Sequence, residues 1–187
     1  MTSNVDKRII HSKAAIKESF LSLLEKKPVE KMTVKEICDN AYITRSTFYA
    51  YYMNEYDLLQ KLTQELVEDS FKIVDSVSPM QPPSEIQAKL TELFEFFGRN
   101  SSLLKYVSGH ELDKNIREMI YKYYDRRFGN DMYYTQSDQK NILYVFLLDG
   151  TMGLIHFWFV GDQRISCGKM AYCLERFYSG CINNFKH

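Results

Sequence analysis

An arginine and a series of hydroxyl side chains lie close together between residues 33 and 52. Arg45 carries the side chain best suited to a bidentate contact with guanine O6 and N7. The hydroxyl groups can donate hydrogen bonds to phosphate oxygens, which sets the register of a protein on DNA without reading its sequence. They belong to Thr33, Thr44, Tyr49 and Tyr51. These residue types predict a surface that contacts duplex DNA.

Two short helices and a turn would position these side chains. Thr33-Val-Lys-Glu36 has the pattern of a capping box, which opens a helix that lasts to about Asn40. After the turn, a second short helix is expected from Thr44 to about Tyr51. This arrangement is a helix-turn-helix, whose second helix enters the major groove of DNA.

The second helix is predicted to have two distinct faces. At about 100° per residue, Phe48 and Tyr52 share the face that we expect to pack inward. Ser46 and Ala50 lie nearly opposite, and small side chains there allow the backbone to settle deep in a groove. The outward face would therefore be the one that meets DNA.

The same pattern also fits the caps and half-buried aromatic residues of an ordinary helical bundle. The chain holds 24 Lys/Arg and 24 Asp/Glu, and this neutral total by itself argues against phosphate neutralisation. Divided near residue 53, however, the charge separates: residues 1–53 carry nine basic and six acidic side chains, whereas residues 54–187 carry 15 and 18. The resulting +3 and −3 favour DNA contact by the first part.

Helix signals continue along almost the whole chain, and no alternating pattern bounded by hairpin turns predicts a strand. We expect an all-α fold of about nine helices. Outside the helix-turn-helix they are predicted at 7–26, 54–77, 84–98, 101–108, 113–128, 137–161 and 166–185. Ser84 with Gln87 is expected to cap the third of these.

Residues 78–84 hold three of the four prolines and form the one convincing linker. We therefore predict a DNA-binding domain at 1–53, with 54–77 as a connecting helix, and a helical domain at 78–187 that serves dimerisation and effector binding.

Enzyme chemistry has little support in the sequence. The four cysteines have no zinc-ligand spacing, and His110-Glu111 lacks the second histidine of a zinc-protease motif. No nucleophile-base set or phosphate-binding loop is present either. We expect no catalytic residues, no metal and no cofactor.

Free thiols and an N-terminus without an apolar signal run indicate the cytoplasm.

Residues 142–161 form an apolar run of 20 residues with a single charge, which is long enough to cross a bilayer. Asp149 near its middle and the scarcity of flanking Lys and Arg argue against a spanning helix. We expect instead a helix buried on nearly all sides, with His156 as a hydrogen-bonded core residue.

The segment TVKEICDNAYITRSTFYAYYMNEYDLL, residues 33–59, resembles the DNA-binding signature of TetR/AcrR-type transcriptional regulators. The resemblance extends from about Lys7 to Leu62. It implies an Ω-shaped homodimer that binds a palindromic operator and a C-terminal domain that responds to a small-molecule effector. At the matching positions it implies base contacts by Arg45, Ser46, Thr47 and Lys35, and backbone contacts by Thr33, Thr44, Tyr49 and Tyr51.

Three positions depart from the family pattern. Tyr42 stands where the family often has glycine, and because tyrosine is strained at positive φ we expect the turn to be built differently. Glu55 replaces a common lysine and would repel phosphate, while Ala50 removes one contact. Glu55 and the small +3 charge motivate a second hypothesis: a TetR-like co-regulator that binds a protein partner and has weak or no DNA affinity.

The segment from Gly150 to Trp158 more weakly resembles a family branch in which a glycine-bearing apolar helix precedes a tryptophan. In TetR-like proteins the last two long helices form a four-helix dimer interface, which would explain the apolar run without a membrane. The implied interface residues are Gly150, Gly153, Phe157, Tyr172 and Phe177.

Aromatic residues of the second half are candidates for the lining of an effector pocket, since such cavities between helices commonly bind small molecules. They are Phe94, Phe97, Tyr106, Tyr123, Tyr124, Phe128, Tyr144 and Trp158.

Overall fold

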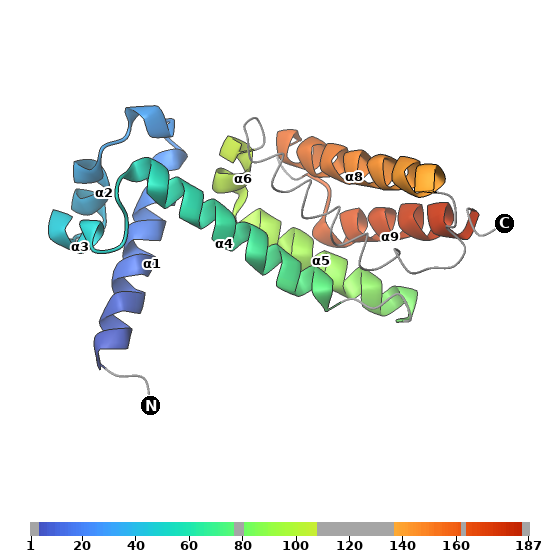
Figure 1. Cartoon of the computed structure of the whole chain (residues 1–187), viewed down its shortest axis with the longest axis horizontal. Coiled ribbons are helices and arrows are strands. Elements are labelled where there is room, and N and C mark those ends of the chain that lie inside the picture. Colours follow the sequence, from blue (N-terminus) through green and yellow to red (C-terminus); the bar gives the residue numbers. More distant parts are fainter. Residues whose placement is uncertain (1–3, 77–80, 108–136, 162–163, 185–187) are drawn as a thin grey trace. The chain divides into compact units, whose positions relative to one another are not determined.

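The computed structural model describes residues 4–76, 81–107, 137–161 and 164–184. Within these ranges the chain forms eight α-helices and one 3-10 turn, with no strand (Figure 1). This confirms the all-α fold and comes close to the expected number of helices. The helix predicted at 113–128 lies outside the described residues.

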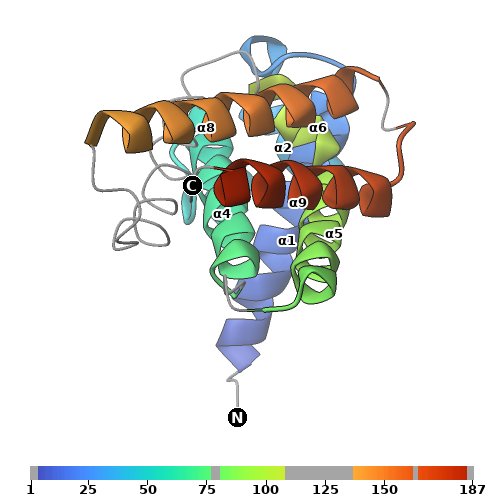
Figure 2. The ribbon, with the colours of Figure 1, turned by 90° about the vertical axis from the view of Figure 1, so that its right-hand side faces the viewer.

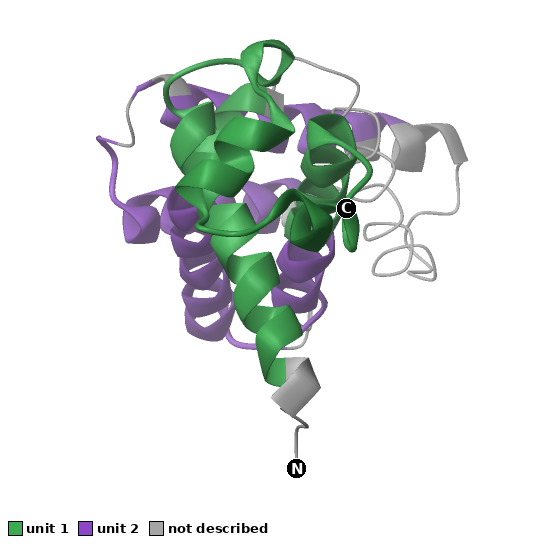
Figure 3. Ribbon diagram, turned by 90° about the vertical axis from the view of Figure 1, so that its left-hand side faces the viewer, with its two compact units in different colours: residues 1–66, 102–106 green, residues 67–101, 107–187 purple. Residues whose placement is uncertain are grey.

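The first compact unit comprises residues 1–66 together with 102–106 (Figure 3). It contains α1 (Asn4–Leu24), the 3-10 turn η1 (Val29–Lys31), α2 (Val34–Asn40), α3 (Arg45–Tyr49) and the first part of α4 (Glu55–Asp75). Part of α6 (Ser101–Val107) also belongs to it. Its core is built from side chains that are less than 2% exposed: Ile16, Phe20, Val29, Ile37, Cys38, Phe48, Leu58, Leu62 and Leu103.

The second unit comprises residues 67–101 and 107–187. Its long helices are α5 (Pro83–Arg99), α8 (Ser137–Val160) and α9 (Cys167–Asn184). Figure 2 shows α8 and α9 side by side, where the hydroxyls of Thr151 and Tyr178 are hydrogen-bonded to each other. The indole N–H of Trp158 donates to the carbonyl of Ile165 at 2.7 Å, which ties the end of α8 to the segment before α9.

The start of α5 differs from the prediction. The helix begins at Pro83 after Pro82, and no side chain caps it, so the expected capping by Ser84 is wrong. Proline is favoured in the first helical turn because its φ is already helical and its missing N–H has no partner to lose there. Ser84 therefore lies inside the helix.

Helix α8 is apolar on all sides but is not buried on all sides in a single chain. Leu143, Leu147 and Trp158 are at most 5% exposed, whereas Phe146 and Phe157 are 64% and 60% exposed. The expectation of near-complete burial is thus wrong for the isolated chain. His156 is exposed, so it is not the core histidine that we expected.

Among the described residues, no helix combines the length and the apolar character that a membrane crossing requires.

Candidate nucleic-acid interface

The capping box at the start of α2 is confirmed. The backbone N–H of Glu36 donates to Thr33 Oγ1 at 3.3 Å, and the backbone N–H of Thr33 donates to Glu36 Oε2 at 3.0 Å. The Thr33 hydroxyl also donates to Glu36 Oε2 at 2.9 Å, while Lys27 Nζ donates to Glu36 Oε1 at 2.5 Å. Hydrogen bonds from Lys27 and Thr33 lower the pKa of Glu36. The carboxylate therefore holds the first turn of α2 in place.

The turn between α2 and α3 contains a tyrosine in a left-handed conformation. Tyr42 has φ 53° and is the one non-glycine residue with positive φ in the described chain. Its N–H donates to Asp39 O at 3.4 Å, and the N–H of Ile43 donates to Cys38 O at 3.1 Å. These two bonds define a Schellman motif, with Tyr42 at the position that glycine normally occupies. The expectation of a differently built turn is wrong.

Helix α3 is capped by a threonine. The Thr44 hydroxyl accepts from the Thr47 N–H at 3.2 Å and lies 2.8 Å from the Ser46 hydroxyl and 2.9 Å from the Thr47 hydroxyl. A side-chain acceptor at this position satisfies an amide that would otherwise have no partner. Helix α3 is only five residues long, and this cap fixes its start.

Helix α3 ends at Tyr49 and not at about Tyr51 as expected, but the two residues predicted to face inward are both buried. Phe48 is fully buried and Tyr52 is 5% exposed, and their ring centroids are 5.6 Å apart. The rest of α3 is open to solvent: Arg45, Ser46 and Tyr49 are exposed, and Ser46 lies nearly opposite Phe48 around the helix. Thus α3 is anchored on one side and presents polar side chains on the other.

The remaining predicted contact residues lie on neighbouring parts of the same unit. Lys35 on α2 is exposed, as are Thr33 and Thr44, and Thr47 is half-buried. Tyr51 is also half-buried, and Lys13 Nζ lies 5.7 Å from the centre of its ring. All eight predicted residues therefore lie in the first unit, and the hydroxyls of Thr33 and Thr44 already serve as caps.

The start of α4 fixes the end of the helix-turn-helix. The Asp57 N–H donates to Asn54 Oδ1 at 2.9 Å, while the N–H of Met53 donates to Asp57 Oδ2 at 2.8 Å. Lys61 Nζ donates to the same carboxylate at 2.9 Å and to the carbonyl of Tyr51 at 3.0 Å. Hydrogen bonds from Met53 and Lys61 lower the pKa of Asp57.

The predicted pocket residues have different surroundings. Phe94, Phe97 and Trp158 are at most 9% exposed and pack edge to face, with the Phe94 centroid 5.3 Å from that of Trp158. Tyr106 belongs to the first unit, where its hydroxyl donates to Glu30 Oε1 at 2.8 Å. Tyr123, Tyr124 and Phe128 lie outside the described residues, as does the side chain of Tyr144.

The predicted interface residues all lie on exposed surface of the second unit. Phe157, Tyr172 and Phe177 are 60%, 44% and 56% exposed. A Cβ added to Gly150 or Gly153 would meet no atom within 4 Å outside its own helix backbone.

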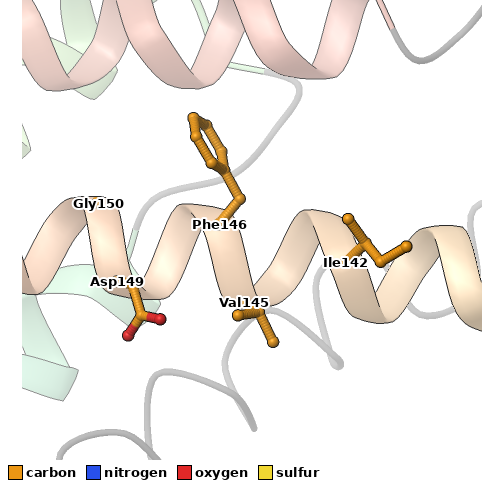
Figure 4. Close-up of a pocket in the computed structure, with 5 residues that line it drawn as sticks. All are labelled: Ile142, Val145, Phe146, Asp149 and Gly150. Carbon is orange, nitrogen blue, oxygen red and sulfur yellow. The ribbon is translucent and has the colours of Figure 1, made fainter.

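The exposed apolar surface of α8 includes residues that the sequence did not predict to lie there. Ile142, Val145 and Phe146 are 56% to 65% exposed and, with Asp149 and Gly150, line an open hollow of about 580 Å³ along α8 (Figure 4). Their spacing of three and four residues places them on one face of α8, but because this helix is apolar on all sides, no sequence signal marked that face as the exposed one.

The described residues contain no group of His, Cys, Asp and Glu that could hold a metal ion. All four cysteines are free, and burial raises the pKa values of the Cys38 and Cys167 thiols.

No protein-family model matches the sequence. A protein described as an uncharacterized HTH-type transcriptional regulator, YxbF of Bacillus subtilis (strain 168), is 30% identical over 89 residues. The matched segment is 47% of this chain and only 23% of that protein.

Two solved structures match almost the entire chain. A TetR transcriptional regulator from Streptococcus agalactiae 2603V has a TM-score of 0.63 at 23% identity, covering 92% of this chain and 96% of that one. The dihydroxyacetone kinase operon activator DhaS has a TM-score of 0.58 at 18% identity, covering 93% of each chain. All three similar proteins are named as regulators, not as enzymes. The chain therefore has the fold of the TetR-type transcriptional regulators.

Proposed function

We propose that this chain is a DNA-binding transcriptional regulator of the TetR family, acting in the cytoplasm, whose helix α3 enters the major groove. One observation carries the proposal: α3 is anchored by buried Phe48, with buried Tyr52 packed beside it, and leaves Arg45, Ser46 and Tyr49 exposed to solvent. A recognition helix needs both properties, a rigid seat and a polar free face. The DNA-binding part is residues 1–53, with 54–77 as the connecting helix.

The proposed contacts are of two kinds. Arg45 is directed at a guanine edge, with Ser46, Thr47 and Lys35 as further base contacts. Tyr49 and Tyr51 donate to phosphate oxygens, while Thr33 and Thr44 contact the backbone beside the helix ends that they cap.

The functional form is a homodimer that binds a palindromic operator. The exposed apolar faces of α8 and α9 support this. In a single chain, large aromatic side chains on these helices are exposed to solvent, namely Phe157, Tyr172 and Phe177. A two-fold interface that buries them would place one α3 in each of two major grooves, about one helical turn or a small multiple apart.

Regulation comes from residues 78–187, where a small-molecule effector binds. A ligand that prefers one spacing of the two recognition helices shifts the population toward that spacing. When the preferred spacing no longer matches the operator, DNA is released and repression ends.

A gel shift with the promoter region beside the chain's own gene, titrated with salt, tests DNA binding. We expect a shift that weakens steeply as salt rises, because phosphate contacts release counterions. Arg45→Ala should lose discrimination between operator and mutated operator by roughly 1–3 kcal/mol, whereas Tyr49→Phe should weaken binding to both alike. The absence of any shift at low salt would refute the proposal. A reporter under the same promoter tests repression.

A second candidate is a co-regulator that binds a protein partner rather than DNA. Glu55, at the first residue of α4, favours it, because a carboxylate there repels phosphate. Normal dimerisation without a gel shift, together with co-purification of a partner regulator, would support this alternative. Restoration of DNA binding by Glu55→Lys would show that the fold had kept the interface and lost one contact.

A further inference from the structure

Tyr42 is the most exposed large apolar or aromatic residue of the described chain. Its side chain is 96% exposed, while its backbone has φ 53° two residues beyond the end of α2 at Asn40. A residue with a Cβ is disfavoured in this left-handed conformation, and glycine or asparagine adopts it more readily. Because the ring buries almost no surface, the packing of this side chain does not offset its backbone strain. Glycine at this position would therefore give a more stable fold.

The position of Tyr42 suggests what its side chain is for. It lies in the turn between α2 and α3, three residues before Arg45. In a bound helix-turn-helix the first helix crosses the DNA backbone, and the N-terminal residues of the second reach base edges. The turn that joins them is thus next to the phosphates that border the groove.

We propose that Tyr42 is a further DNA-contacting residue, whose phenol hydroxyl donates a hydrogen bond to a backbone phosphate of the operator. This inference rests on the proposed function. Duplex bases are stacked on one another, so the expected contact is with the backbone and not with a base face. A contact of this kind adds affinity and register but no sequence preference.

The Schellman motif supports a rigid placement of the ring. The N–H groups of Tyr42 and Ile43 are both bonded to carbonyls of α2, at 3.4 Å and 3.1 Å. The backbone that carries the phenol is therefore held by the end of α2, and the contact needs little ordering of the main chain. Only the side-chain rotamer has to be selected on binding.

Two variants separate the hydroxyl from the backbone effect. Tyr42→Phe keeps the ring and removes the hydroxyl. Tyr42→Gly removes the whole side chain and also the backbone strain that a residue with a Cβ has at positive φ. The measurements are the dissociation constant by fluorescence anisotropy, at one fixed salt concentration with the promoter fragment beside the chain's own gene, and the midpoint of thermal unfolding. Tyr56→Phe is the matched control, because Tyr56 is 50% exposed in the same unit and is not among the proposed contact residues.

We expect Tyr42→Phe to weaken binding by about tenfold, as for the loss of one hydrogen bond to a charged group. Tyr42→Gly should weaken binding at least as much, while its unfolding midpoint stays the same or rises by up to about 4 °C. The control should bind as the wild type does. The loss should be similar on operator and on mutated operator, because a phosphate contact does not read bases.

The results distinguish failure of this inference from failure of the proposed function. If the wild-type protein does not bind the fragment, the proposed function fails and this inference fails with it. If the wild type binds and both Tyr42 variants bind equally well, the inference alone is overturned. If Tyr42→Gly unfolds at a lower temperature, Tyr42→Phe decides, and unchanged affinity in that variant would assign Tyr42 a purely structural role.

Discussion

Replacement of Phe48 by alanine should unseat the recognition helix. Phe48 is fully buried, and its ring centroid lies 5.7 Å from that of Tyr49 and 5.6 Å from that of Tyr52. Truncation of a buried phenylalanine costs about 3–5 kcal/mol, because apolar contacts are lost and a cavity remains. Domains of this kind have total unfolding free energies of about 5–15 kcal/mol, so the loss is a large share of the total.

The effect on DNA binding follows from the length of α3. A helix of five residues has almost no stability by itself, since isolated helices shorter than about 12–15 residues are marginal in water. Tertiary packing through Phe48 must therefore hold α3 in its helical form. We expect Phe48→Ala to lose most operator affinity even at temperatures where the rest of the chain remains folded.

Urea unfolding followed by far-UV circular dichroism measures the first effect, and fluorescence anisotropy with the promoter fragment measures the second. Tyr49→Ala is the matched control: it removes a neighbouring aromatic side chain that is 56% exposed. That variant should lose affinity but little stability. If Phe48→Ala loses less than about 1 kcal/mol and binds DNA normally, the proposed anchoring is wrong.

Three further predictions concern other parts of the chain. The pKa of Glu36 is lowered by hydrogen bonds from Lys27 and Thr33, so its contribution to stability is complete above its ordinary pKa of 4.5 and is lost as the pH falls through the lowered value. Urea unfolding across this pH range should show a decline that is smaller in Glu36→Gln, since Asp57 also contributes to it. Trp158→Phe removes the N–H that donates to Ile165 O at 2.7 Å, and should lower the unfolding free energy by about 1 kcal/mol, measured by circular dichroism. An unchanged unfolding free energy would mean that this hydrogen bond does not stabilise the fold. Phe157→Glu places a charge on a side chain that is 60% exposed in the single chain. Light scattering should show a monomer where the wild type is a dimer, and a persistent dimer would exclude this face as the interface.

The sequence by itself determined the features that depend on short separations along the chain. The capping box of Thr33 and Glu36 and the cap of α3 at Thr44 join residues three apart, so a local pattern contains all the information needed. The burial of Phe48 and Tyr52 was equally predictable from their spacing of four residues, although α3 itself ends at Tyr49.

Only the tertiary structure decided which side of α8 is covered. A helix that is apolar all round has no periodicity to indicate its buried face, so sequence patterning could not separate Leu147, which is 5% exposed, from Phe146, which is 64% exposed. Likewise, nothing local shows that Tyr106 hydrogen-bonds to Glu30, a residue 76 positions earlier in the chain.

The positive φ of Tyr42 also could not be predicted from the sequence, because a tyrosine at that position favours negative φ. Tyrosine avoids positive φ, yet Tyr42 adopts it in the four-residue connection between the end of α2 at Asn40 and the start of α3 at Arg45. Local preference is a small term, and packing of both helices through Ile37 and Phe48, each fully buried, outweighs it. Short-range chemistry thus predicted where α2 and α3 begin, and long-range packing decided how the helices are turned and joined.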